Sequence, residues 1–301
     1  MRVRRRTDRT PRWWSDDNDA VVDSFEFALA RDTETFDQAF RLVHDRYVEA
    51  GYMQALPSRH RLSLFNALPS TKVFVTKDAS CVIATLTLIQ DSALGLPMDG
   101  IYRDELDSLR ARGRRLAEVS AFAMESRYRA QGISIVMRLM RATYAFAATI
   151  ARLDDLCIAV HPRHADFYRD ALNFHAFGQL KPYETVNGAP AIALRLDLDW
   201  ARERMGRLVA GEAPNRELEE FFFGSAARAW SLSRLGPDPA RAGFTAGQFL
   251  HFFAGRGALT SDAAEKLSLI IRSYYPELSL GALEAPAGLS RSADLRSPSA
   301  V

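Results

Sequence analysis

The sequence has few of the features that mark metal-binding, disulfide-rich or membrane-spanning proteins. Its 301 residues include two cysteines, Cys81 and Cys157, and six histidines. No C-x-x-C motif occurs, so we predict neither a disulfide framework nor a metal site. Both cysteines fall inside apolar, strand-like runs, which predicts two buried thiols. No apolar segment follows the N-terminal arginines, and no uninterrupted apolar run approaches the roughly eighteen residues of a membrane-spanning helix, so we expect a cytoplasmic protein.

An excess of one charge is also missing. The chain has 39 lysines and arginines against 37 aspartates and glutamates, a formal net charge of +2. This balance argues against a nucleic-acid-binding protein. A hydrophobic content of 48% is ordinary for a globular protein, and the length suits one large domain or a domain with an appendage.

Residues 23–199 alternate between strand-like and helix-like patterns. The predicted strands are 25–30, 72–76, 81–89, 116–124, 155–160 and 189–198, and the predicted helices begin at Asp32 or Thr33, at Tyr102, after Gly132 and at His164. Lys77–Ser80 is predicted as a hairpin turn. This order predicts an α/β fold, a mixed sheet flanked by helices on both faces.

The regions on either side differ in composition. Residues 1–22 mix arginine, aspartate and tryptophan without periodicity, which indicates a flexible arm. Helical periodicity dominates residues 200–278, including 217–235, and we interpret this region as a helical appendage. Its phenylalanines at 221–223 cannot all face one side of a helix, so we expect some to meet another surface. Residues 279–301 have the composition of a disordered tail.

The segment 116–141 reads as a strand, a basic turn with glycine and a long apolar helix. The free N–H groups at the start of a helix bind phosphate well. Arg129–x–x–Gly132–x–Ser134 loosely matches the R/Q-x-x-G-x-G/A turn with which GNAT acyltransferases bind the phosphates of an acyl donor. Alternatively, this turn binds no phosphate and has only a structural role.

Two further runs are more specific. They are HPRHADFY, residues 161–168, and PYETVNGAPA, residues 182–191. Together they make the chain similar to the FeeM-type N-acyl amino acid synthases over about residues 25–198. These GNAT-fold enzymes are related to acyl-homoserine-lactone synthases and transfer a long-chain acyl group from acyl carrier protein to the α-amine of an amino acid.

This resemblance implies a GNAT-like sheet followed by the helical appendage, and an N-acyltransferase with no permanently bound cofactor and no metal. The implied donor is an acyl-phosphopantetheine carried by acyl carrier protein or CoA, and the implied acceptor is an amino acid. Residues expected to bind the donor are Arg127, Arg129, Gln131, Gly132 and Ser134. Residues expected to bind the acceptor are His161, His164, Tyr183 and Asn187; for the two histidines, a cap at a strand–helix junction is the alternative.

Three residues are the catalytic candidates. Glu118 would accept the proton of the attacking amine, which requires a desolvated carboxyl or a bridging water, because an ordinary pKa near ~4.3 is too low. The alternative is an exposed glutamate, or one paired with Arg114 or Arg115. Ser120 lies on the same face of the strand. Tyr168 would protonate the leaving sulfur; alternatively, it is a core aromatic residue.

One departure concerns the acceptor. Related synthases typically carry arginine after the Glu–x–Ser of this strand, and Ala121 stands there instead. This departure keeps open a non-catalytic module that binds acyl carrier protein. An acetyl-CoA-dependent N-acetyltransferase of small molecules is a separate alternative. Arginines at 110–115 and 127–141 would suit an acidic carrier protein. The C-terminal helices could pack against the acyltransferase domain or one another and only stabilise it. Alternatively, they could cover the acyl chain, or contact a carrier protein or a membrane surface.

Overall fold

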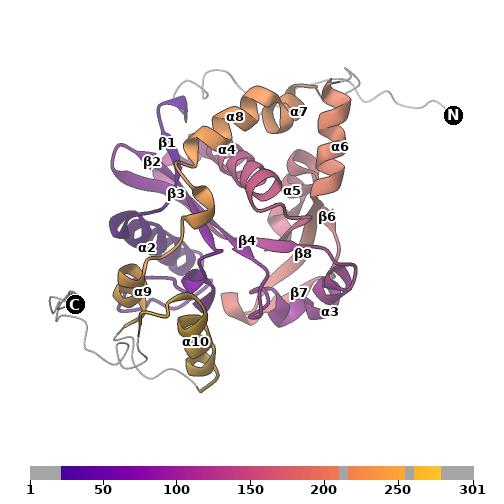
Figure 1. Ribbon diagram of the computed structural model, residues 1–301. Coiled ribbons are helices and arrows are strands. Elements are labelled where there is room, and N and C mark those ends of the chain that lie inside the picture. Colours follow the sequence, from indigo (N-terminus) through magenta and orange to yellow (C-terminus); the bar gives the residue numbers. More distant parts are fainter. Residues whose placement is uncertain (1–21, 210–215, 255–260, 279–301) are drawn as a thin grey trace, which may run out of the picture. The chain divides into compact units, whose positions relative to one another are not determined.

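A computed structural model describes residues 22–209, 216–254 and 261–278 (Figure 1). The predicted disordered tail, and the predicted flexible arm apart from Val22, lie outside these residues. The chain divides into two compact units, residues 1–243 and 244–301. The first unit therefore includes the beginning of the region that the sequence suggested as an appendage.

The first unit is built on a mixed sheet of eight strands in the order β1-β2-β3-β4-β5-β8-β6, with β7 also paired to β8. All neighbours are antiparallel except β4 and β5, which are parallel. The strands are β1 (Glu26–Leu29), β2 (Lys72–Asp78), β3 (Cys81–Gln90), β4 (Leu116–Met124), β5 (Asp155–Val160), β6 (His175–Ala176), β7 (Lys181–Tyr183) and β8 (Ala189–Asp197).

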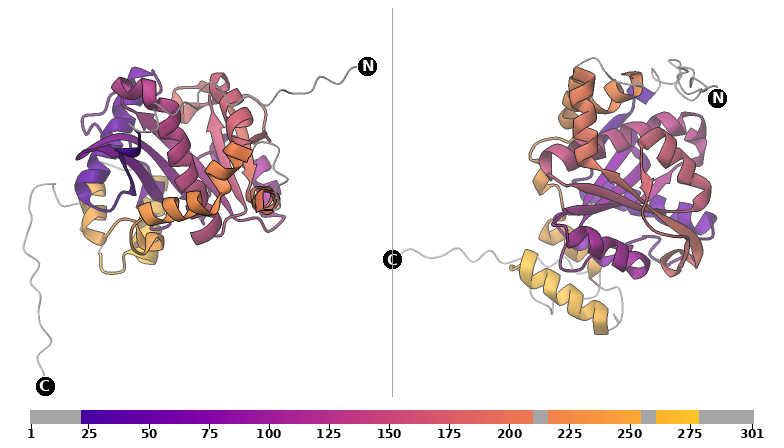
Figure 2. Two further views of the ribbon diagram at one scale, coloured as in Figure 1. Left: turned by 90° about the horizontal axis from the view of Figure 1, so that it is seen from above. Right: turned by 90° about the vertical axis from the view of Figure 1, so that its right-hand side faces the viewer.

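Helices cover both faces of the sheet (Figures 1 and 2). Helix α2 (Thr33–Glu49) packs on β3 and β4, whereas α4 (Gly132–Ala145) joins the core on the other face with Leu86 and Leu88. Because strand side chains alternate between faces, Thr85 and Thr87 of β3 point toward the α2 side. Two shorter helices, α3 (Asp99–Arg110) and α5 (Ala165–Leu172), complete this part of the unit.

Helix α4 forms the centre of the core. With its flanking turns it spans Ser126–Ile150, which is long and apolar enough to cross a membrane, but 72% of its most apolar window is buried inside the protein. Its apolar composition therefore reflects burial in the core. The apolar residues Leu96 and Met98 likewise form core contacts beside α3.

Helices α6 (Leu198–Val209), α7 (Arg216–Phe223) and α8 (Ser225–Arg234) extend this core, and α8 runs along α4 (Figure 1). Phe222 and Phe223 are buried, and the Phe223 ring lies edge-on to Tyr144 with centroids 4.9 Å apart. Arg141 of α4 lies 4.2 Å from the Phe221 ring centroid. The phenylalanine cluster thus packs on α4. The helical periodicity predicted over 217–235 is confirmed, and Gly224 divides the region into two helices.

The second unit contains α9 (Ala246–Phe253) and α10 (Ser261–Tyr274). Thr245 begins α9 with a capping box, in which Gln248 is the reciprocal partner. Its aromatic rings pack on one another, with centroids 4.6 Å apart for Phe249 and Tyr275. This contact accounts for part of the aromatic surface that the sequence displayed.

The predicted α/β order is confirmed, with bounds that match within a few residues for most elements. The short strands β6 and β7 were not predicted, and α3 begins earlier than Tyr102. The predicted hairpin turn is shorter than expected, since Asp78 pairs with Cys81. The prediction of two buried thiols is therefore correct for Cys157 and wrong for Cys81. Cys81 follows the turn directly and is exposed.

Candidate active site

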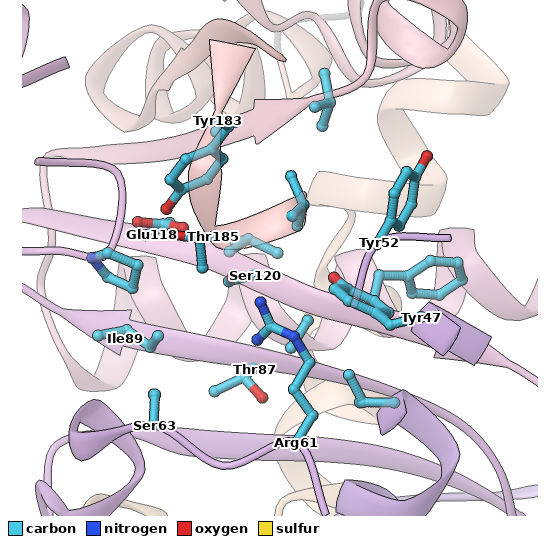
Figure 3. A pocket seen from close by; sticks show the side chains of 18 of the residues that line it. Tyr47, Tyr52, Arg61, Ser63, Thr87, Ile89, Glu118, Ser120, Tyr183 and Thr185 are labelled. Atoms are coloured by element: carbon cyan, nitrogen blue, oxygen red, sulfur yellow. The ribbon is translucent and has the colours of Figure 1, made fainter. Parts of the chain in front are cut away.

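A cavity of about 330 Å³ lies on the α2 side of the sheet (Figure 3). Its polar part contains Glu118, Ser120, Arg61, Tyr47 and Tyr183. Its apolar part is formed by α2 and the strands beneath it, through Ala39, Phe40, Val43, Val73 and Phe122. One space therefore offers both titratable groups and an apolar surface.

A β-bulge in β4 shapes this cavity. Opposite β3, the pairing shifts between Thr87–Ser120 and Thr85–Ala123, and Ala121 adopts a left-handed backbone with φ of 52°. On its other side, β4 pairs with β5 only over Leu116–Glu118 among the described residues. The two parallel strands therefore part beyond Glu118, which leaves β4 backbone groups on that side without a ladder partner. Such groups can bind a ligand carbonyl.

Glu118 is buried in this opening, with 2% of its surface exposed. Its Oε2 accepts a hydrogen bond of 2.8 Å from the backbone N–H of Met98, and Ser120 provides a side-chain hydrogen bond. Burial disfavours the charged form and raises the pKa of Glu118 to about 7. A carboxyl with this pKa is suited to accept a proton near neutral pH.

The alternatives for Glu118 do not hold in this structure. Arg114 pairs with Asp155, and Arg115 lies 3.1 Å from Asp154, so both arginines have other carboxylate partners. The glutamate is also not exposed to solvent. Its environment is therefore that of a desolvated acid facing a cavity, as the catalytic hypothesis requires.

Tyr168 lines the same cavity from α5. Its ring packs edge-on against Phe174 with centroids 5.8 Å apart, which holds it in place. Among the described residues its hydroxyl has no hydrogen-bond partner, and burial raises its pKa to about 12. A neutral phenol with an uncommitted O–H can donate a proton or hydrogen bond to a ligand.

His161 and His164 lie at the cavity edge where β5 ends. His161 Nδ1 accepts a hydrogen bond from the backbone N–H of Arg163 at 3.2 Å, so it caps the short helical turn Pro162–His164. Burial, then Arg163, lowers the pKa of His164, which favours the neutral ring. Capping and cavity contact thus coexist at these residues.

The two remaining residues expected to bind the acceptor are separated. Tyr183 is buried and directs its hydroxyl toward Glu118 (Figure 3), and burial raises its pKa. Asn187 is not part of the described cavity lining; its side chain donates a 3.0 Å hydrogen bond to the Gly51 carbonyl. Its left-handed backbone places it in a turn, while Thr185 lines the cavity instead.

The predicted donor turn lies at the junction of a 3₁₀ turn, Ser126–Gln131, and α4. None of its five candidates, Arg127, Arg129, Gln131, Gly132 and Ser134, belongs to the described cavity lining. Arg127 and Arg129 are exposed, and no side chain caps the start of α4. A Cβ at Gly132 would lie 2.8 Å from the Met124 methyl group, so the glycine permits close packing against β4.

Sequence reasoning missed several cavity residues. Arg61 and Ser63 come from residues 50–71, which show neither strand nor helix periodicity, and Tyr47 and Tyr52 surround the end of α2. No sequence pattern distinguished Arg61 from the neighbouring basic residues Arg59 and His60. Within the described ranges, no group of three or more His, Cys, Asp or Glu side chains could hold a metal ion.

Comparison with known proteins identifies a family that matches this part of the chain. Residues 38–197 match the profile of the family described as N-acyl amino acid synthase FeeM. The structure of FeeM, from uncultured soil microbes, is similar with 29% identity and a TM-score of 0.53, over 64% of this chain and 97% of FeeM.

Two other solved structures are more distant. The AHL synthase LasI has 16% identity and a TM-score of 0.47, over 58% of this chain and 90% of its own. An N-acetyltransferase from Staphylococcus aureus Mu50 has 17% identity and a TM-score of 0.41, over 58% and 98%. No functionally curated protein matches the chain. The family match covers more than half of the sequence, and this chain therefore belongs to the FeeM N-acyl amino acid synthase family, a group of N-acyltransferases with a GNAT-like fold.

Proposed function

We propose that this enzyme transfers a long-chain acyl group from a phosphopantetheine thioester to the α-amine of an amino acid, which yields an N-acyl amino acid. The observation that carries the proposal is the buried Glu118 at the point where an apolar cavity meets the opening between β4 and β5. A base, an apolar surface and unpaired backbone groups meet there, as acyl transfer to an amine requires.

The acyl group would enter between β4 and β5. Backbone N–H groups of β4 near the Ala121 bulge would stabilise the oxyanion that forms when the amine attacks the thioester. The alkyl chain would lie along the apolar part of the cavity, through Phe40, Val43 and Phe122. Each buried methylene contributes about 0.8 kcal/mol, so this surface favours a long chain over acetyl.

Proton transfers would complete the reaction. Glu118 accepts a proton from the attacking amine, directly or through water, as the new C–N bond forms. The tetrahedral intermediate then collapses, the C–S bond breaks, and Tyr168 protonates the departing thiolate. The products are the amide and free pantetheine thiol, and the proton taken by Glu118 restores Tyr168 through solvent.

The donor and its carrier belong to the same proposal. The start of α4 would bind the donor phosphate through backbone N–H groups, aided by Arg127 and Arg129, whose exposed side chains also suit an acidic carrier protein. We favour acyl carrier protein in the cytoplasm as the source. The packing of Phe222 and Phe223 on α4 gives these two residues a structural role, which removes part of the reason to propose membrane contact.

The experiment is to overproduce the protein and its Glu118→Gln variant in bacteria and analyse the lipids by mass spectrometry. An N-acyl amino acid that appears with the wild type and is absent with the variant would support the proposal and identify both substrates. Purified enzyme is then assayed with matched acyl-carrier-protein and acyl-CoA donors. Turnover with acetyl-CoA without preference for longer chains would contradict it in favour of a small-molecule N-acetyltransferase, and binding of carrier protein without turnover would indicate a non-catalytic module.

A further inference from the structure

Arg61 projects its guanidinium into the middle of the cavity (Figure 3). The Cζ atom lies 4.6 Å from the centroid of the Tyr47 ring, so the flat guanidinium is held by a cation–π contact. Among the described residues, no carboxylate forms an ion pair with it. Its N–H donors are therefore available to an anion that enters the cavity.

Some other partly buried arginines in the described part of the chain pair with carboxylates. Arg110 contacts Asp91 and Asp99, and Arg195 contacts Asp155 and Asp197. A half-buried guanidinium without a carboxylate loses part of its hydration, and a ligand anion would add to the compensation that the Tyr47 ring provides. Arg61 is thus placed for binding a ligand.

The segment that carries Arg61 is fixed in position. The Arg61 backbone N–H donates to the Phe40 carbonyl of α2 at 3.2 Å, and the adjacent His60 contacts Asp37 at 2.8 Å. Arg59 pairs with Asp45 on the outside of the same segment. The Arg61 side chain therefore starts from an anchored backbone, which reduces the entropy lost on binding.

Arg61 and Glu118 face the same space. They form no ion pair, yet the guanidinium is near enough to oppose the rise in the pKa of Glu118. Ser120 lies in the direction in which the guanidinium points (Figure 3). We propose that Arg61 binds the α-carboxylate of the acceptor amino acid, so that the α-amine of the same molecule lies at Glu118. This inference rests on the proposed function, and it restricts the acceptors to amines that carry an adjacent carboxylate.

A donor phosphate is the other anion that could reach a guanidinium. The cavity position argues for the carboxylate, because Arg61 shares the cavity with the buried Glu118, whereas the predicted donor turn contributes no described lining residue. A planar guanidinium also matches a carboxylate through two parallel hydrogen bonds. The two ligands can be separated by kinetics, since one belongs to the acceptor and the other to the donor.

The test compares full-length wild type, Arg61→Gln and Arg61→Lys, with Arg59→Gln as the control. The control removes one positive charge from the same segment, at a position 59% exposed outside the cavity. Each protein is assayed with the preferred amino acid and with its carboxamide, which keeps the α-amine but lacks the charge. Calorimetric binding of an N-acyl amino acid and of its carboxamide provides a readout that does not depend on turnover.

We expect Arg61→Gln to lower kcat/KM for the amino acid by about 100-fold, leave the carboxamide and the donor KM unchanged, and weaken binding of the N-acyl amino acid alone. Arg61→Lys should retain part of the activity, and Arg59→Gln should behave as wild type. Equal losses for acid and amide would overturn the inference and assign Arg61 a structural role, and a raised donor KM would assign it to the donor. Absence of any N-acyl amino acid from wild type would refute the proposed function, whereas unchanged binding in Arg61→Gln would refute only the role of Arg61.

Discussion

Replacing Glu118 by glutamine tests the mechanism most directly, because the change removes a base and preserves shape. The amide can still accept the hydrogen bond from the Met98 N–H that Glu118 accepts at 2.8 Å. We expect kcat/KM to fall by about 10²–10⁴-fold, the usual contribution of a positioned general base. The donor KM should stay the same, because Glu118 lies at the polar end of the cavity and not at the donor turn.

The pH profile gives a second measure. Since the pKa of Glu118 is raised to about 7, wild-type kcat/KM should rise about tenfold per pH unit below 7 and level off above it. Glutamine cannot ionise, so the residual activity of the variant should lack this rise. Steady-state rates between pH 5 and 9 at saturating donor would provide both curves.

The stability of the wild-type protein should fall over the same pH range in which its kcat/KM rises. Because folding raises this pKa from 4.5 to about 7, the folded state holds the proton more tightly, and stability from this group is present below pH 4.5 and lost as pH rises through 7. The difference amounts to about 3 kcal/mol. Glu118→Gln should therefore gain about 3 kcal/mol relative to wild type between pH 4.5 and pH 8, as measured by urea unfolding.

The matched control is Glu26→Gln, the same chemical change at an exposed position of β1. It should leave the rate, the pH profile and the pH dependence of stability as in wild type. If Glu118→Gln kept wild-type kcat/KM, or if the wild-type profile rose near pH 4.5 instead of 7, Glu118 would not be the base. If the free energies of unfolding of Glu118→Gln and wild type differed by the same amount at every pH, the Glu118 carboxyl would not be desolvated.

Three further predictions follow from the cavity and its supports. Tyr168→Phe should lower kcat about 10²-fold with an alkyl thioester donor but much less with an aryl thioester, whose thiolate leaves without a proton; equal losses would contradict the acid role. Ala121→Gly should keep or increase stability, since a left-handed alanine costs about 1–2 kcal/mol, whereas Ala121→Val should reduce both Tm and kcat; a stable, active valine variant would refute the importance of the bulge. Residues 1–243 should fold cooperatively by circular dichroism, and residues 1–198 should not, because the shorter chain removes Phe222 and Phe223 from the core; a folded shorter chain would contradict this packing.

The order of strands and helices could be predicted because burial imposes periodicity. The strand 116–124 and the strand 155–160 were predicted with their observed bounds, since both alternate or run apolar between polar turns. The short strands β6 and β7 could not, because two or three residues carry no period. Cys81 shows a second limit: its run is apolar, but it begins at the tip of a hairpin, where no neighbour covers the side chain.

The candidate site shows the same division. Glu118 and Ser120 could be placed on one face of a strand from alternation alone, and Tyr168 followed from the family resemblance. The burial that raises the pKa of Glu118 depends on α2 and residues 50–71 folding over β4, which no local pattern contains. Asn187 illustrates the reverse case, because its motif was visible but its side chain holds a turn to Gly51 instead of lining the cavity.

The structure explains how alanine fits at position 121. With alanine at this position, strand β4 carries no positive charge after the Glu–x–Ser motif, in contrast to the arginine that the family resemblance led us to expect. The small side chain suits the left-handed backbone of the bulge, which in turn separates β4 from β5 beside Glu118. A guanidinium still reaches the same cavity, but it comes from Arg61 in the segment anchored to α2. The cavity therefore contains a desolvated acid together with Arg61, for which no carboxylate partner occurs among the described residues, and in our proposal selection of the acceptor depends on Arg61 and not on β4.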